Sequence, residues 1–521
     1  MRVTNVDVVV TGPDGKPVTG LTRDDFRIFE NGEEKQASNF LEVRSSVAVG
    51  SLTPAGAEKE TAQSFNEDFR RRDITVFVDN AALHPLRRNQ ILPQLRRFLE
   101  TSVRSGDTVV IVVWNRSLQI ELEPTGDRER IREALASLEG RTALGGEDAA
   151  AKEELYRELA WMVRAYADID KKPAWSTGVT AVRIYAMQRA SSVRQRVEAV
   201  KSLLAWRRGF DGRKIMVLLT AELPMNPGEE MFHYLDSIRD SFDFASPMAS
   251  SEAREFEIPS LITEIAAAAN SSGVTLYPID AAGKDSGMPA RDASVMPVLT
   301  PAGKIEQARS MDTLRSVAEE TGGIALSGSD NWKLAFDTIA NDLESYYSIG
   351  YRASGEPEDR MKRIEVRLRD GRYKVRTRSA VVERSVTSEM HDAVAANLFR
   401  PSTANDLTVR ATAGSAVPQS EEAVLVPVSV TIPMDELTLI PDGDDLTGRV
   451  AIFAAFLRSD GAVSKVAQQP GVIRFPADSL AGRKELTLKI DVTMDGQTDG
   501  ISVGVMDEFS RATGFAAVTL Q

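Results

Sequence analysis

From Val3 to Phe40, apolar and polar residues alternate along the chain. Val6, Val8 and Val10 fall on one face of an extended segment, and the turn sequence Gly12-Pro13-Asp14-Gly15 follows them. Alternation of this kind indicates strands with one buried face, separated by tight turns. The segment therefore predicts strands of a small β-sandwich.

The hydrophobic period changes at residue 73. Asp73–Asn80 reads DITVFVDN, a short apolar run that indicates a strand buried on both faces. Similar runs follow at Thr108–Val113, Lys214–Thr220 and Val274–Asp280. Amphipathic stripes between and after them predict helices at Asn89–Ser105, Arg128–Leu138, Asp148–Ala167, Thr180–Trp206, Ile258–Asn270, Ile305–Thr321 and Trp332–Ser345. Strands that alternate with helices predict a parallel α/β sheet with helices on both faces.

Strand-like alternation returns over residues 346–385. This segment and residues 1–45 are each too short to hold a core alone. Because the ends of a domain usually lie close together, we predict that the two segments form one discontinuous β-sandwich. Residues 73–345 are then an α/β domain inserted into that sandwich, with a helical insertion of its own at 148–206.

Two segments poor in large apolar residues, 46–72 and 386–420, are predicted to be linkers. Residues 421–521 consist of short strand-like runs separated by turns. Their number and length predict an immunoglobulin-like β-sandwich.

Composition narrows the classes of function. A length of 521 residues suggests about three domains. A formal net charge of −13 argues against a nucleic-acid-binding protein, and the absence of cysteine excludes disulfides and thiolate chemistry. No apolar run is long enough for a transmembrane segment. The first residues show no signal peptide, so we expect either a cytoplasmic protein or an exported one whose leader is absent from this chain.

Several segments together resemble the VWFA-related family, first described as an acidobacterial domain. GRKIMVLL resembles the fourth strand of its von Willebrand factor A-type domain, GVTLYPIDAAG the fifth, and DLESYYSIGYRASG its exit into the β region. The resemblance covers nearly the whole chain. It implies an A-type α/β domain and a periplasmic or secreted location. We interpret the chain as a non-enzymatic protein–protein interaction protein.

The resemblance also implies a site for a divalent ion, usually Mg²⁺. The family pattern places Asp-x-Ser-x-Ser after the first strand, and here Asp79 is present whereas Ala81 and Leu83 stand at the serine positions. Thr142 matches a later threonine ligand, and Ala221 replaces an aspartate. Because Mg²⁺ needs several hard oxygen ligands, we expect a degenerate site in which Asp79 caps nearby amides and accepts a hydrogen bond from Thr142.

A metal-dependent adhesin remains an alternative, with Glu222 and Asn80 as substitute ligands for Mg²⁺. A hydrolase with an unrecognised carboxylate site and an inert scaffold are further alternatives. The favoured interpretation is a crevice that binds a protein partner of unknown identity, and the oligomeric state stays open. The residues predicted to line that crevice are Asp79, Asn80, His84, Arg141, Thr142 and Glu222.

The helical insertion permits two interpretations. Arginines recur along it at positions 157, 164, 183, 189, 194 and 196. We expect them to be solvated, or paired with Glu153, Glu154 and Glu158, on helices that pack against the α/β domain. The alternative is a docking surface beside the crevice. Its anchors would be Trp161, Trp175 and Tyr185.

Overall fold

The computed structural model describes residues 3–44, 47–49, 71–141, 143–165, 171–210, 212–221, 223–239, 248–281, 301–326, 331–353, 359–398, 405–420, 423–458, 463–476, 484–495 and 498–519. The chain divides into two compact units. Unit 1 consists of Met1–Leu204, Asp211–Gly355 and Met361–Val382, and unit 2 of Ala205–Phe210, Glu356–Arg360 and Glu383–Gln521.

A five-stranded sheet is the centre of unit 1. Its strands are β6 (Arg72–Val78), β7 (Thr108–Trp114), β8 (Leu118–Thr125), β9 (Arg213–Thr220) and β10 (Val274–Asp280). They lie in the order β10-β9-β6-β7-β8, with β8 antiparallel to β7 and the other pairs parallel. Every residue of β6, β7 and β10 is buried, which explains their uninterrupted apolar sequences.

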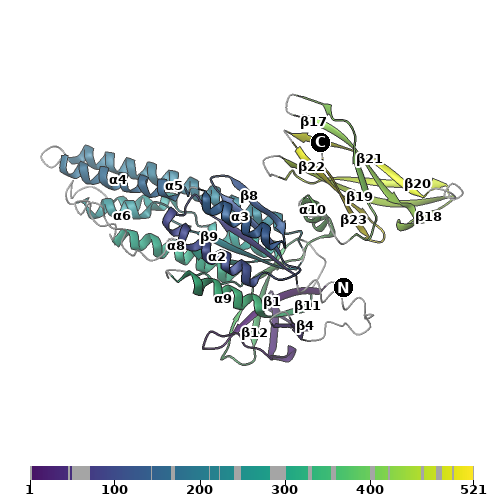
Figure 1. Ribbon diagram of the computed structural model, residues 1–521, viewed down its shortest axis with the longest axis horizontal. Coiled ribbons are helices and arrows are strands. Elements are labelled where there is room, and N and C mark those ends of the chain that lie inside the picture. Colours follow the sequence, from purple (N-terminus) through teal and green to yellow (C-terminus); the bar gives the residue numbers. More distant parts are fainter. Residues whose placement is uncertain are drawn as a thin grey trace. The chain divides into compact units, whose positions relative to one another are not determined.

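Helices flank this sheet, as Figure 1 shows. They are α2 (Pro85–Ser102), α3 (Arg128–Gly140), α7 (Leu261–Ser272), α8 (Pro301–Glu320) and α9 (Trp332–Glu344). Side chains of α2, α3 and α9 share one apolar core with the sheet, while α7 and α8 contact each other and β10. The arrangement agrees with the predicted α/β sheet. It brings the carboxyl ends of β6, β7 and β9 to one edge.

The helical insertion forms a second core. It contains α4 (Gly145–Ala165) and α5 (Lys171–Arg207), which pack with α6 (Glu229–Ser237), a helix that was not predicted. The short 3-10 helices Ala249–Ser251 and Ala253–Phe256 complete this core. The insertion is thus a packed subdomain of unit 1.

Two further sheets of unit 1 contain strands from both ends of its sequence. One sheet has the order β13-β1-β11-β4-β5 and the other β14-β12-β2-β3. The strands are β1 (Val3–Thr11), β2 (Phe26–Glu30), β3 (Glu33–Lys35), β4 (Ala37–Arg44), β5 (Val47–Val49), β11 (Ser345–Arg352), β12 (Met361–Leu368), β13 (Lys374–Arg376) and β14 (Ala380–Val382). β11 lies between β1 and β4, with its Ile349 opposite Val6 on one side and Phe40 on the other. A 3-10 turn at Arg23–Asp25 precedes β2.

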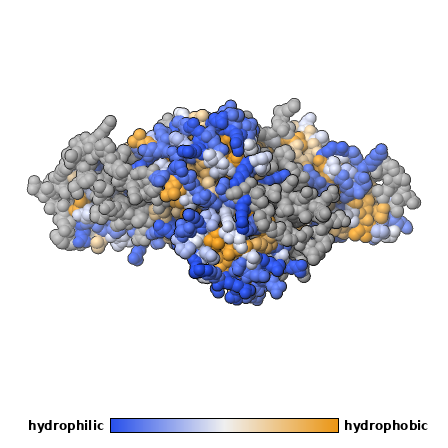
Figure 2. Space-filling view, turned by 60° about the horizontal axis from the view of Figure 1, so that its bottom comes forward, coloured by the Kyte–Doolittle hydropathy of each residue, from blue (hydrophilic) through white to orange (hydrophobic). Residues whose placement is uncertain are grey.

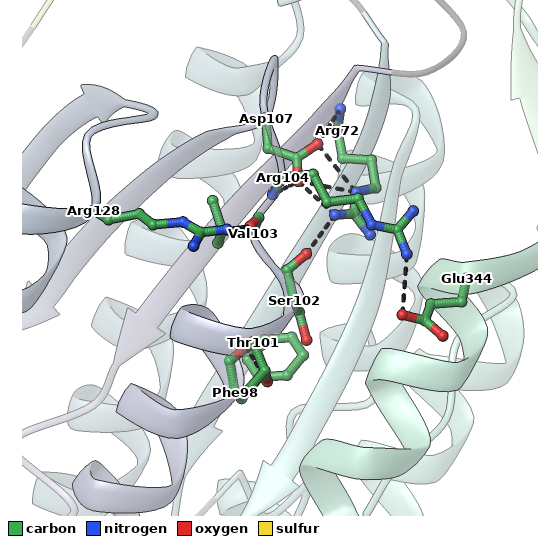
Figure 3. Close-up of polar contacts among 9 residues, drawn as sticks. All are labelled: Arg72, Phe98, Thr101, Ser102, Val103, Arg104, Asp107, Arg128 and Glu344. Carbon is green, nitrogen blue, oxygen red and sulfur yellow. Dashed lines mark hydrogen bonds and ion pairs between the residues drawn. The ribbon is translucent and has the colours of Figure 1, made fainter. Parts of the chain in front are cut away.

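A buried ion pair fixes the amino end of β6 (Figure 3). Arg72 opens this strand, and its Nε lies 3.1 Å from Oδ1 of Asp107, which precedes β7. The main-chain amide of Arg104 also donates to Asp107, at 2.7 Å, while its guanidinium reaches Glu344 at the end of α9, at 3.0 Å. These contacts join the starts of two strands to α9. They lie at the opposite end of β6 from Asp79.

Unit 2 contains two sheets. One includes β15 (Arg410–Ala413), β16 (Val417–Pro418), β17 (Ala423–Pro433) and β21 (Glu485–Asp495), and the other β18 (Ile440–Asp442), β19 (Asp445–Arg458), β20 (Ala467–Pro476), β22 (Thr498–Asp507) and β23 (Thr513–Thr519). Both contribute to one apolar core. A 3-10 turn, Met434–Glu436, lies between β17 and β18.

The prediction of a linker at 386–420 is wrong for much of that segment. Val386–Asn397 form α10, which packs on β19 and β22, and β15 and β16 follow in the same segment. Met390 and Val394, one helical turn apart, are buried against Phe453. Ser385 caps the helix by accepting a hydrogen bond from the Ser388 amide. A small apolar stripe and a cap were therefore enough to form a helix that composition did not predict.

On the face shown in Figure 2, the described residues are largely hydrophilic, with small apolar patches. Among the described residues, no helix combines the length and the apolar character that crossing a bilayer requires.

Candidate functional site at the carboxyl edge of the sheet

Asp79 follows β6 directly and is fully buried. Its amide donates to the carbonyl of Leu219 on β9, at 2.9 Å. Its carboxylate accepts hydrogen bonds from the Ala82 amide, at 3.2 Å, and from Thr220 Oγ1, at 2.6 Å. The amide-capping part of the prediction is present. The hydroxyl comes from Thr220, and the predicted partner Thr142 lies outside the described residues, as does Glu222.

A guanidinium from the helical insertion completes the environment of Asp79. Nε of Arg196, on α5, lies 2.5 Å from Oδ2 of Asp79, and both side chains are completely inaccessible to solvent. A second pair lies beside the first, because Arg189 of α5 is 2.8 Å from Asp148 of α4. Two carboxylates and two guanidinium groups thus form a compact cluster with balanced charge.

Arg189 and Arg196 lie inside the protein, whereas the sequence predicted them at the surface. The helical phase of α5 contained the information needed to place them inside. Its buried positions include Val182, Ala186, Arg189, Val193, Arg196, Val200 and Leu203. These follow one another at alternating steps of four and three residues, the spacing of a single buried stripe. An arginine on such a stripe is expected to have a buried acidic partner.

The protonation of Asp79 is set by opposing effects. Burial raises the pKa of the Asp79 carboxyl above its usual range, and Arg196, Thr220 and Ala82 oppose that rise. Burial also lowers the pKa of Arg196, against the attraction of Asp79. Because arginine retains its proton in proteins, the guanidinium remains the positive charge in this cluster.

This environment does not fit a divalent ion. Oδ2 of Asp79 is already engaged by Arg196 and Thr220. Mg²⁺ needs near-octahedral oxygen coordination, and a fixed guanidinium at the same carboxylate would repel it. The side chains of Ala81, Leu83 and Ala221 are buried and offer no ligand oxygen. Within the described ranges, no group of three or more His, Asp or Glu side chains is arranged to hold a metal.

Asn80 organises the loops around this edge and is also fully buried. Its side chain accepts a hydrogen bond from Arg88 and donates one to Asn115, both at 2.7 Å. Its carbonyl accepts from the Leu144 amide, at 2.9 Å. Arg88 also donates to the carbonyl oxygen of Arg141. Sequence analysis missed Arg88 because the predicted helix began at Asn89, whereas α2 begins at Pro85.

The predicted crevice is therefore filled from within. Asp79 and Asn80 lie inside the protein and cannot contact a partner in this structure. Gly145, at the start of α4, packs so closely on the loop after β6 that a Cβ there would lie 2.5 Å from the carbonyl oxygens of Ala82 and Leu83. The first turn of α4 thus covers the place where a ligand was expected.

The remaining predicted residues have local roles. His84 is the N-cap of α2 and accepts a hydrogen bond from the Leu86 amide, at 3.3 Å. Arg141 is exposed and forms an ion pair with Glu121, at 2.5 Å. The structure does not bring these two side chains together with Asp79 at one open surface.

The three predicted aromatic anchors do not form one surface. Trp175 and Tyr185 are buried in the core of the insertion, where the Tyr185 hydroxyl donates to Glu230 at 3.1 Å. The side chain of Trp161 is exposed. Docking through all three residues is therefore incompatible with this packing.

No family model matches the chain, and no curated protein matches it. Solved structures with similarity include an aerotolerance-related membrane protein from Bacteroides fragilis, at 12% identity over 52% of this chain and 98% of that one, with a TM-score of 0.25. BatB from Bacteroides thetaiotaomicron also has 12% identity, over 52% and 96%, with a TM-score of 0.25. The von Willebrand factor domain of the pilus-tip protein Mfa5 from Porphyromonas gingivalis has 11% identity, over 52% and 94%, with a TM-score of 0.25. Similarity at this level assigns neither a family nor a function.

Proposed function

We propose that this chain is a non-enzymatic protein–protein interaction protein whose A-type domain works without a divalent ion. The observation that carries the proposal is the buried ion pair between Asp79 and Arg196. In this account the guanidinium takes the place of the metal as the cation beside Asp79. The site is a degenerate form of a metal-ion-dependent adhesion site, and its charge is satisfied within the chain.

The burial of Asp79 supports a non-catalytic role. A general acid, base or nucleophile must come within hydrogen-bond distance of its substrate. The Asp79 carboxylate is inaccessible to solvent and already accepts from Thr220 and Ala82. It is therefore placed to hold α5 against the sheet rather than to meet a substrate.

The domain organisation and location belong to the same proposal. The pairing of β1 and β4 with β11 supports an A-type domain inserted into a discontinuous sandwich. The two sheets of unit 2 support an immunoglobulin-like C-terminal domain. Membership of the acidobacterial-type VWFA-related family, and with it a periplasmic or secreted location, rests on the sequence resemblance. The partner is a protein, and its identity is open.

Thermal unfolding in the presence of metal ions tests this function. After chelation, we expect the melting temperature of the full chain to stay the same, within error, on adding millimolar Mg²⁺, Mn²⁺ or Ca²⁺. A specific ion at a hundredfold excess over its dissociation constant would stabilise the folded state by about 2.7 kcal/mol, which raises the melting temperature by several degrees. Such a rise, lost in Asp79→Ala, would overturn the proposal and support a metal-dependent adhesin.

A further inference from the structure

A groove lies beside the filled crevice, between α5 and the turn that connects β7 to β8. Its volume is about 470 Å³, within the range of sites that hold a small ligand or a few side chains of a peptide. Trp114, at the end of β7, lines the groove, and its carbonyl accepts a hydrogen bond from the Ala81 amide at 3.0 Å. The groove therefore adjoins the same loop as Asp79.

Three of the residues that line the groove are apolar. Trp114 and Ala199 are buried, with 7% and 5% of their surfaces exposed, and Leu118 is half-buried. Each of these side chains borders the open volume. An aromatic ring and two aliphatic groups at the base of a hollow form the kind of surface against which an apolar side chain of a peptide gains affinity by burial.

Arg194 brings an uncompensated positive charge to the rim. Arg157, Arg183, Arg189 and Arg196 of the same two helices each have a carboxylate partner. Arg194 is exposed, and no hydrogen bond or ion pair joins it to another described residue. Glu198, one turn further along α5, also lines the groove, and its carboxylate is 2.7 Å from Lys201.

Arg116 adds a second cation at the other side of the groove. It lies in the β7–β8 turn with a φ of +63°, a conformation uncommon for residues other than glycine. Its guanidinium is 2.9 Å from Glu147, in a pair whose side chains are both 62% exposed. Ion pairs that are so exposed contribute little free energy, so a carboxylate from a partner exchanges readily for Glu147.

We propose that this groove binds an acidic segment of a partner protein. A partner carboxylate pairs with Arg194, and a neighbouring apolar side chain packs on Trp114 and Leu118. The guanidinium fork suits a carboxylate, which it binds through two parallel hydrogen bonds. The inference rests on the proposed function and identifies the chemistry of its partner.

Peptide binding to the full chain tests the inference. The probes are a fluorescein-labelled peptide of alternating Glu and Leu and its matched form with Gln in place of Glu, measured by fluorescence anisotropy. We expect the Glu peptide to bind at least tenfold more tightly than the Gln peptide, and more weakly as salt rises. Arg194→Glu should weaken its binding at least tenfold. Arg157→Glu is the matched control, because it makes the same charge change at an exposed position outside the groove, and should change binding less than twofold.

Several results would overturn this inference. They are equal affinity for the two peptides, no binding at millimolar peptide, or an effect of Arg157→Glu as large as that of Arg194→Glu. A single-stranded oligonucleotide that binds wild type and not Arg194→Glu, or a dimer of wild type that Arg194→Glu dissociates, would assign the groove to another occupant. The metal response of the melting temperature is measured on the same samples. A response to Mg²⁺ refutes the proposed function, whereas failure of peptide binding alone refutes only the groove.

Discussion

At the scale of single residues, an ion pair and two hydrogen bonds reach the carboxylate of Asp79 from three directions. Arg196 reaches it from α5, Thr220 from β9, and the Ala82 amide from the following loop. Taking two charges out of water costs several kcal/mol per ion, so such a pair adds little net stability over an apolar replacement. Its value lies in selectivity, since α5 can pack on this edge only in the register that brings Arg196 to Asp79.

Asp507, at the end of β22, is a second aspartate that holds a loop. It accepts main-chain hydrogen bonds from Thr438, at 2.7 Å, and from Phe509, at 2.8 Å. Burial raises the pKa of Asp507, but these amides and that of Ser510 outweigh it, so the pKa lies below its ordinary value. The folded state therefore binds this proton less readily than the unfolded state. The resulting stability is present above the unfolded-state pKa of an aspartate and is lost as the pH falls through the lowered pKa.

Asp507→Asn should therefore destabilise unit 2 by about 1–3 kcal/mol at pH 7, because neutral oxygens accept these hydrogen bonds less strongly. It should also flatten the loss of stability between neutral and acid pH. Urea unfolding followed by circular dichroism at a series of pH values measures both effects. Asp435→Asn, the same change at an exposed position, is the control. An unchanged pH profile in Asp507→Asn would contradict the assignment.

The sequence predicted Asp79 at the end of a buried strand because the apolar run before it is unbroken. It did not predict the partner, because nothing local links Asp79 to a helix so far along the chain. The alternating steps of four and three residues along α5 place Arg196 inside. This spacing is recognised only when arginine is counted as a possible core residue. Amphipathicity counted by hydrophobic residues alone treats Arg189 and Arg196 as exposed.

At the scale of elements, α4 closes the edge of the sheet through Gly145. A Cβ at this residue would meet the main chain of Ala82 and Leu83, and main-chain atoms cannot move aside as a flexible side chain can. Gly145→Ala should therefore shift the first turn of α4 and destabilise unit 1 by about 1–3 kcal/mol.

Gly140→Ala, near the end of α3, is the matched control. A Cβ there meets nothing within 4 Å, so alanine should be neutral or stabilise the helix by up to about 1 kcal/mol. Urea unfolding of the two variants measures the difference. If Gly145→Ala is as stable as Gly140→Ala, α4 does not pack on the loop after β6 in the way described.

Long, strongly periodic elements were predictable and short ones were not. The buried strands of the central sheet have apolar runs that few other structures produce, so their positions agree closely with the structure. α6 and α10 escaped prediction because each is short, with nine and twelve residues. Tertiary contacts, rather than intrinsic propensity, stabilise helices of this length.

At the scale of the whole molecule, unit 1 depends on contacts between distant parts of the chain. β11 follows the α/β domain in sequence and pairs with β1 and β4, which precede it. Tyr347 on β11 reinforces this pairing by donating to the Val18 carbonyl, at 2.9 Å. The return of strand periodicity predicted that these two segments belong to one sandwich, because neither can bury a core alone, and that domain assignment stays a prediction. The register of the strand pairing could not be predicted in this way.

At this scale, the proposed interaction surface differs from the one that the sequence predicted. Sequence reasoning located it at the carboxyl edge of the sheet, where parallel α/β sheets bind ligands. The helical insertion occupies that edge, with α4 over the loop and Arg196 at the carboxylate. The open groove beside it is bounded by α5, the same helix that fills the crevice. One insertion therefore both fills the expected site and bounds the groove that we propose in its place.

A double-mutant cycle between Asp79 and Arg196 tests the central claim most directly. Asp79→Ala and Arg196→Met each leave one buried charge without its partner and should each destabilise unit 1 by about 3–5 kcal/mol. The double variant should lose less than the sum of the two, with a coupling energy of about 1–3 kcal/mol. Arg194→Met, two residues away on the exposed face, should show no coupling to Asp79→Ala.

Urea unfolding of the full chain followed by tryptophan fluorescence is the measurement. Trp114, Trp161, Trp175 and Trp332 lie in unit 1 and Trp206 in unit 2, so the signal reports mainly on unit 1. Coupling for Arg196 but not for Arg194 is the result that the account predicts. Effects of Asp79→Ala and Arg196→Met that add within about 0.5 kcal/mol would contradict it, because the two side chains would then not act as one buried pair.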